Sequence, residues 1–146
     1  MKVKDILREK DGKLVTAQPA MNVLKAMELI IGNRISCLPV LDASGQLVGI
    51  ISDKDIFRAV YEHQETFRRF TVGDLMTTNL IVGVADDDVD YIGGVMTKNR
   101  FRHVPIVDKA KLIGLISVGD IVKAQIKQME IENRYLKLYM EGNYPG

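Results

Sequence analysis

The sequence predicts an α+β fold, α/β-like in character, in which two pseudo-symmetric β-α-β-β-α units pack together and a C-terminal helix follows. One observation is an internal repeat that covers most of the 146 residues. A second is that each copy passes through the same order of extended and helical patterns. A third is size, because a unit of about 60 residues buries too little apolar surface to be stable alone.

The repeat is visible in two pairs of segments. "NRISCLPVLD" (33–42) aligns with "NRFRHVPIVD" (99–108) at an offset of 66. After a turn that is one residue shorter in the second copy, "GIISDKDI" (49–56) aligns with "GLISVGDI" (114–121) at an offset of 65. Because the identities and the apolar pattern agree in both pairs, this repeat organises the chain.

The repeat divides the chain into a first copy at 1–62, a second copy at 63–124 and a C-terminal helical tail at 125–146. Near the start of the chain, "VKDIL" (3–7) echoes the "VGDLM" (72–76) that opens the second copy. The mixed-charge segment "YEHQETFRRFTV" is the natural connection between the two copies.

Each copy is predicted to open with a short extended segment, "LVTA" or "LIVGV", and to continue into an amphipathic helix. The apolar face of the first helix consists of Val23, Ala26, Met27 and Ile30. That of the second consists of Val89, Ile92 and Met96. Gly93 and Gly94 weaken the second helix by roughly 1 kcal/mol each.

Two β-rich runs follow each helix. They read "CLPVLD" and "QLVGIIS" in the first copy, and "HVPIVD" and "KLIGLIS" in the second. A short turn of Asp, Ser, Gly or Lys joins them, as in a hairpin. The last helix of each copy is predicted to begin at the serine that ends the second run.

The C-terminal tail is predicted to be helical from Val122 to Glu141 and to end at Gly142. Its apolar residues follow the a and d positions of a heptad: Val122, Ile126, Met129, Leu136 and Met140. Asn133 takes an a position, where asparagine sets the register of two-stranded coiled coils. Packing on its own domain and pairing across a dimer both fit, and we favour the dimer.

Composition and charge exclude several classes of protein. Twenty basic and 19 acidic residues give a net charge of +1, which argues against a nucleic-acid or membrane-surface partner. The N-terminus lacks the apolar core of a signal peptide, and no apolar stretch is long enough to span a bilayer. The single cysteine, Cys37, lies in an apolar run and is expected to be buried. We expect a soluble, cytoplasmic protein.

We find no catalytic or metal-binding motif in the sequence. "DDDVD" resembles the start of a calcium loop, but Tyr91 and Thr97 stand where the loop needs Gly and Glu. Cys37, His63 and His103 share no zinc-like spacing. We therefore expect no catalytic residue, no metal, no required cofactor and no enzymatic activity.

The repeated Ser-x-x-Asp has two explanations. Ser52 and Ser117 can cap the helices that follow, and Asp55 and Asp120 suit the positive end of the helix dipole. Alternatively, the aspartates contact a ligand, since two carboxylate oxygens can accept bonds from adjacent ribose hydroxyls. Both can hold together, and the doubled occurrence favours ligand contact by at least one aspartate.

These segments resemble a tandem of CBS domains, the arrangement called a Bateman module in a stand-alone CBS domain-containing protein. The motifs that carry the resemblance are "RHVPIVD", "LIGLISVGDI", their first-copy versions and "VGDLMT". They span about residues 1–125. The resemblance implies a pseudo-twofold pair of units with two clefts that bind adenine nucleotides.

The resemblance also implies roles for individual residues. Ribose and phosphate contacts fall on Ser52, Asp55, Ser117 and Asp120. Basic residues before the hydrophobic-Pro step, here Arg102 and His103, face phosphate in the family. The first copy has Ser36 and Cys37 at those positions, so one cleft is expected to bind phosphate poorly.

Three further candidates have ordinary structural alternatives. Lys54 is a phosphate candidate, although an exposed lysine at a helix start is common. Ile35 and Phe101 are candidates for the adenine wall or plain core residues. Arg102 and His103, in adjacent strand positions, point to opposite faces, so a shared phosphate requires a twist, a bulge or two clefts.

The predicted function is a regulatory adenine-nucleotide sensor without catalysis. AMP is the leading ligand, with ATP, ADP, NAD and S-adenosylmethionine as further candidates. Ligand state would pass to an unknown regulated protein through the pair or a homodimer. The alternative is a pure protein–protein interaction module with non-functional clefts. We expect unequal sites, with Asp120 favoured over Asp55.

Overall fold

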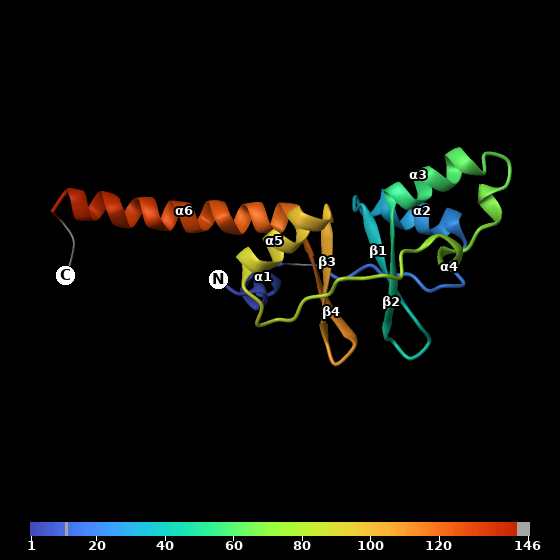
Figure 1. Cartoon of the computed structure of the whole chain (residues 1–146), viewed down its shortest axis with the longest axis horizontal. Coiled ribbons are helices and arrows are strands. Elements are labelled where there is room, and N and C mark those ends of the chain that lie inside the picture. The colour runs from blue at the N-terminus through green and yellow to red at the C-terminus, as the bar shows by residue number, and fades with distance from the viewer. Residues whose placement is uncertain (11, 143–146) are drawn as a thin grey trace. The chain divides into compact units, whose positions relative to one another are not determined.

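The computed structural model describes residues 1–10 and 12–142 (Figure 1). In chain order its elements are α1 (Val3–Glu9), α2 (Val23–Gly32), β1 (Cys37–Leu41), β2 (Leu47–Ser52), α3 (Asp53–Glu62), the 3-10 helix η1 (Phe67–Arg69), α4 (Val72–Leu75), α5 (Val89–Asn99), β3 (His103–Asp108), β4 (Lys111–Ser117) and α6 (Val118–Met140). This order of helices and strands confirms the predicted fold class and the C-terminal helix.

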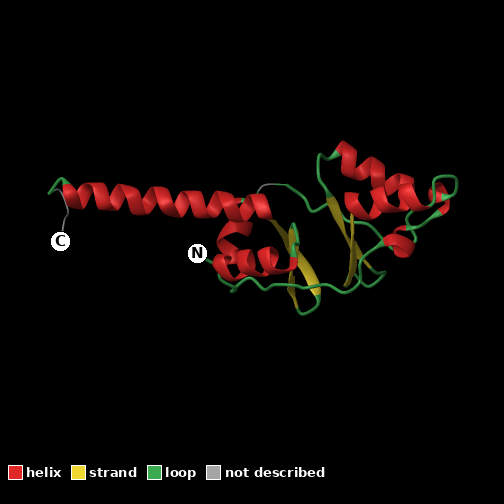
Figure 2. Ribbon diagram, turned by 45° about the horizontal axis from the view of Figure 1, so that its top comes forward, coloured by secondary structure: helices red, strands yellow, loops and turns green. Residues whose placement is uncertain are grey.

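The strands form two small sheets, one from each copy of the repeat (Figure 2). β1 and β2 pair antiparallel, with an irregularity between Val40 and Leu41, and β3 pairs with β4. The opening extended segment of the first copy contributes an isolated parallel bridge between Ala17 and Val40. The predicted first strand of that copy is therefore reduced to a single bridge.

Contacts group the described residues into two compact units. Unit 1 consists of those within Met1–Asp11, Gly83–Val104 and Leu115–Gly146. Unit 2 consists of Gly12–Val82 and Pro105–Gly114. The short helix that opens each copy is grouped with the other copy, and Pro105–Gly114 of the second copy is grouped with unit 2.

In unit 2, α4 is the first α-helix of the second copy, but it is hydrogen-bonded at the start of α2, which belongs to the first copy. The Val72 amide donates to the Met21 carbonyl at 2.7 Å, and the Val23 amide donates to the Phe70 carbonyl at 2.9 Å. Val72 is completely buried. These bonds satisfy backbone donors at the first turns of both helices, which have no partner within a helix.

Unit 1 repeats this arrangement with α1, which opens the first copy. The Val3 amide donates to the Asp87 carbonyl at 2.9 Å, and the Val89 amide donates to the Met1 carbonyl at 3.1 Å. Val3 is also completely buried. The echo between residues 3–7 and 72–76 thus marks two helices that are exchanged reciprocally between the copies.

The apolar faces predicted for the two central helices are confirmed. Val23, Ala26 and Ile30 of α2 are buried in a core cluster with Leu38, Val40, Ile51, Ile56 and Val72. Met27 is half-buried and packs against that cluster. On α5, Val89, Ile92 and Met96 are buried. Cys37 is buried as well, as predicted.

The two glycines of α5 meet different surroundings. A Cβ at Gly93 would lie 3.1 Å from Ile121 Cγ2 on α6, whereas a Cβ at Gly94 would meet nothing within 4 Å. Gly93 therefore allows α5 and α6 to pack closely, and Gly94 does not serve that purpose.

We expect Gly94→Ala to raise the free energy of unfolding by roughly 0.5–1 kcal/mol, because alanine loses less entropy in a helix than glycine. Gly93→Ala is its matched control and should gain less or destabilise, since Ile121 must shift. Urea unfolding of both variants measures the difference, and equal stabilisation would contradict the close packing.

Candidate functional site

Each Ser-x-x-Asp forms a capping box at the start of a helix. At α3, the Ser52 amide donates to Asp55 Oδ2 at 2.9 Å and the Asp55 amide donates to Ser52 Oγ at 3.2 Å. At α6, the corresponding bonds of Ser117 and Asp120 measure 2.8 and 3.1 Å. The capping explanation is confirmed at both positions.

A third capping box separates this geometry from the repeated motif. At α4, the Thr71 amide donates to Asp74 Oδ2 at 2.8 Å and the Asp74 amide donates to Thr71 Oγ1 at 3.2 Å. The sequence around this box lacks the Gly-x-x that precedes Ser52 and Ser117. A capping box alone is therefore no sign of a ligand site.

Backbone bonds bring other predicted residues to the two boxes. The Asp53 amide donates to the Ser36 carbonyl at 2.8 Å, so the segment next to Ile35 lies at the start of α3. In unit 1, the Val118 amide donates to the Arg102 carbonyl at 3.0 Å. Each unit thus places the residues before its first long strand beside its own capping box.

The predicted wall and phosphate candidates differ in exposure. Ile35 is 37% exposed, and Phe101 is half-buried at a cavity of about 530 Å³ between α5 and α6. Lys54 is exposed on the first turn of α3. Arg102 and His103 are half-buried, and β3 begins at His103, so Arg102 lies just before the strand rather than within it.

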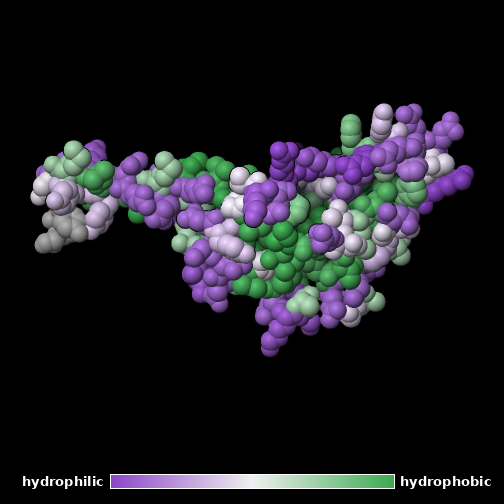
Figure 3. All heavy atoms as spheres, viewed as in Figure 1, coloured by the Kyte–Doolittle hydropathy of each residue, from purple (hydrophilic) through white to green (hydrophobic). Residues whose placement is uncertain are grey.

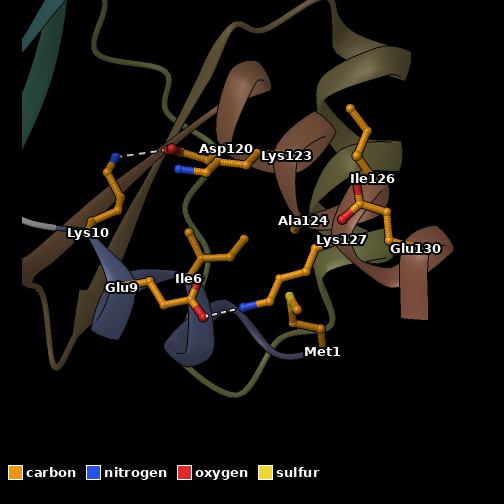
Figure 4. Close-up of a pocket in the computed structure, with 10 residues that line it drawn as sticks. All are labelled: Met1, Ile6, Glu9, Lys10, Asp120, Lys123, Ala124, Ile126, Lys127 and Glu130. Atoms are coloured by element: carbon orange, nitrogen blue, oxygen red, sulfur yellow. Dashed lines mark hydrogen bonds and ion pairs between the residues drawn. The ribbon is translucent and has the colours of Figure 1, made fainter. Parts of the chain in front are cut away.

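Lys10 is a site residue that the sequence did not indicate. Its Nζ donates to Asp120 Oδ2 at 2.8 Å and to the Leu115 carbonyl at 2.8 Å (Figure 4). The lysine follows α1, 110 positions before Asp120 in the sequence. Its position there results from the packing of α1 in unit 1, which no local pattern reveals.

This contact changes the acidity of Asp120. Partial burial raises its pKa, but the hydrogen bond and charge of Lys10 and the bonds from Ser117 outweigh that effect. The net result is a pKa below the usual value of an aspartate. The carboxylate that the repeat points to is therefore held ionised by a lysine.

Lys10 and Asp120 lie at one end of a cavity of about 550 Å³ between α1 and α6 (Figure 4). Lys123 and Lys127 also line it. Lys127 Nζ is bound to Glu9 Oε1 at 2.7 Å, whereas Lys123 forms no ion pair within 4 Å with any described residue. The volume lies within the range of small-ligand pockets.

No group of three or more His, Cys, Asp or Glu side chains within residues 1–10 and 12–142 could hold a metal ion. The acidic segment "DDDVD" instead forms ion pairs with the N-terminus of α1, Asp86 with Lys4 at 3.0 Å and Asp88 with Lys2 at 2.8 Å. No helix in the described part of the chain is long and apolar enough to cross a membrane.

A family model for the CBS domain matches the chain twice, at residues 3–62 and 72–127. The chain belongs to the CBS domain family. CBSX3, a mitochondrial CBS domain-containing protein of Arabidopsis thaliana, is 28% identical over 150 residues, covering 97% of this chain and 73% of that protein. The CBS-domain containing protein of Agrobacterium tumefaciens has a similar crystal structure, with a TM-score of 0.81, 33% identity and coverage of 86% and 99%.

Two similar CBS structures contain adenosine-type ligands. CBSX2 in complex with AMP has a TM-score of 0.76 at 28% identity, with coverage of 88% of this chain and 98% of that one. The CBS domain pair of protein MJ0100, in complex with methylthioadenosine and S-adenosyl-L-methionine, has a TM-score of 0.76 at 30% identity and the same coverage.

Enzymes are also among the relatives. L-aspartate semialdehyde sulfurtransferase of Methanocaldococcus jannaschii is 32% identical over 120 residues, which cover 82% of this chain but 22% of the enzyme. The match therefore concerns a small part of that protein.

We expect Lys10→Met to raise the pKa of the Asp120 carboxyl group, because the substitution removes a hydrogen bond and a positive charge. A depressed pKa stabilises the fold above the unfolded pKa of about 3.9, and this stabilisation is lost as the pH falls through the folded value. Carbon-13 NMR titration of Asp120 measures the shift, with Lys127→Met as the control. An unchanged midpoint in Lys10→Met would contradict the ion pair.

Proposed function

We propose that this CBS pair is a regulatory module that binds adenine nucleotides and performs no catalysis. The observation that carries the proposal is the repeated Ser-x-x-Asp, set in each unit at a helix start beside Ile35 or Phe101. The AMP complex of CBSX2 and the methylthioadenosine and S-adenosyl-L-methionine complex of protein MJ0100 support this ligand class.

The proposed contacts follow from the atoms that the capping boxes leave available. Asp55 and Asp120 both use Oδ2 for the cap. A ribose hydroxyl would donate to the remaining carboxylate oxygen, Oδ1, without breaking the cap. Lys54, Arg102 and His103 remain the phosphate candidates, and AMP remains the leading ligand.

A regulatory role requires more than tight binding. Ligand shifts an equilibrium between two arrangements only if it binds one of them more strongly. We propose that this preference reaches a regulated protein through the CBS pair or through a homodimer.

The proposed dimer forms through α6. Every residue of that helix from Gln125 to Met140 is exposed, a length of about 24 Å, although Lys127 forms an ion pair with Glu9 of α1. Hydrophobic side chains lie along it (Figure 3). A helical segment of this length with so little tertiary support is only marginally stable in water, so we expect a partner to cover it.

The heptad positions favour a second copy of this chain in parallel orientation. Met129, Leu136 and Met140 lie on the seam and are 57–79% exposed. At its a position, Asn133 would face Asn133 of the second chain. Glu132 at a g position would lie opposite Lys137 at the following e position of the second copy, and symmetry gives this ion pair twice.

The nucleotide proposal is tested by thermal unfolding with and without AMP. A ligand at 100 times its Kd adds about 2.7 kcal/mol, or roughly 5–10 °C in Tm. We expect this shift in the wild type and in Asp74→Ala, which loses a capping box of the same geometry. We expect no shift in the Asp55→Ala/Asp120→Ala double variant. Retained AMP binding in that variant would refute the assigned contacts.

The dimer proposal is tested by sedimentation equilibrium. We expect Met129→Glu/Leu136→Glu to convert a dimer into a monomer, because four carboxylates would be buried at the seam. Ile131→Glu/Leu138→Glu is the matched control on the same helix, at f positions outside the seam, and should remain dimeric. A wild-type monomer, or equal loss in both variants, would rule out the a/d seam.

A further inference from the structure

The hydrogen bonds of Asp120 leave its two carboxylate oxygens in different states. Oδ2 accepts from the Ser117 amide and from Lys10 Nζ, both at 2.8 Å. Two donors fill the lone pairs of that oxygen. Oδ1 accepts no hydrogen bond from any residue within 1–10 and 12–142. The side chain of Asp120 is only 19% exposed, so few approaches to Oδ1 remain.

Asp55 has no such lysine among the described residues. Its Oδ2 accepts from the amide and the hydroxyl of Ser52, at 2.9 and 3.0 Å. A hydroxyl can rotate away at little cost, whereas Lys10 must give up an ion pair and its bond to the Leu115 carbonyl. The two aspartates therefore present different electrostatic conditions to the same kind of ligand.

A ribose that donates one hydroxyl to each carboxylate oxygen uses both oxygens of Asp120. Its second hydroxyl competes with Lys10 for Oδ2, and the lysine left without its carboxylate loses a favourable charge interaction. A ligand with a net negative charge offers Lys10 a new anion in place of the Asp120 carboxylate. A ligand with no net negative charge does not.

We propose that Lys10 makes the Asp120 site selective for phosphorylated adenine nucleotides over methylthioadenosine and S-adenosylmethionine. The inference rests on the proposed function, in which Asp120 holds the ribose. The flexible stem of Lys10 carries its charge from Oδ2 to the phosphate within the same cavity. AMP supplies about two negative charges there, methylthioadenosine supplies none, and S-adenosylmethionine has a net positive charge, because its sulfonium and ammonium groups outweigh its one carboxylate.

Lys123 strengthens this selectivity. It lies three residues after Asp120 on α6, lines the same cavity and forms no ion pair within 4 Å with any described residue. Figure 4 shows it extended toward the end of the cavity where Asp120 and Lys10 lie. Its positive charge would therefore add to that of Lys10 when an anionic ligand enters.

The experiment measures the affinities of AMP and methylthioadenosine by calorimetry in an Asp55→Ala background, which leaves the Asp120 site. With Lys10 present, AMP is expected to bind more tightly than methylthioadenosine. Lys10→Met should lower the ratio of the two affinities at least tenfold, by weakening AMP and strengthening methylthioadenosine. Lys25→Met removes the same charge from a lysine that is paired with Glu28 at 3.6 Å and does not line this cavity, and it should leave the ratio within twofold.

Three results overturn the inference, and they separate it from the proposed function. If Lys10→Met leaves the ratio of the two affinities unchanged, Lys10 does not determine selectivity. If the variant binds both ligands more tightly by the same factor, Lys10 only competes with the ribose for Asp120. Ligand binding by the wild type but not by Asp55→Ala places all binding at Asp55 and leaves the proposed function standing. Absence of binding by the wild type removes both. Thermal unfolding without ligand checks that each variant is folded.

Discussion

The rest of the structure depends on the reciprocal exchange of two short helices between the copies of the repeat. Val3 and Val72 are completely buried, and each amide bonds to a carbonyl just ahead of the other copy's central helix. In return, the first amide of each central helix bonds to a carbonyl of the other copy. The same bonds fix α1 in unit 1, and so bring the lysine that follows it to Asp120. The packing of α1 thus both completes unit 1 and places a positive charge beside Asp120.

The sequence predicted the elements well because each has a local cause. Val23, Ala26 and Ile30 show helical periodicity, and the Ser-x-x-Asp motifs cap the helices that they precede. It could not predict which copy α1 packs on, because residues 3–7 and 72–76 look alike and carry no signal of their partners. Lys10 was missed for that reason, whereas Arg102 was noticed through the repeat.

The contact with Lys10 also revises how the two sites compare. The sequence favoured Asp120 because the basic residues Arg102 and His103 lie upstream of it in the second copy, whereas the first copy has Ser36 and Cys37 there. The structure adds an ion pair with Lys10 at Asp120, and Asp55 has no such pair with any described residue. Under the proposed function, inequality between the sites would therefore depend on the charge of the ligand as well as on the number of basic residues nearby.

A crystal structure with AMP tests most directly whether an adenine nucleotide is held through the repeated aspartates. We expect ribose hydroxyls within hydrogen-bond distance of the carboxylate of Asp120, Asp55 or both, with the capping boxes intact. AMP bound elsewhere, with neither carboxylate in contact with the ribose, would contradict it.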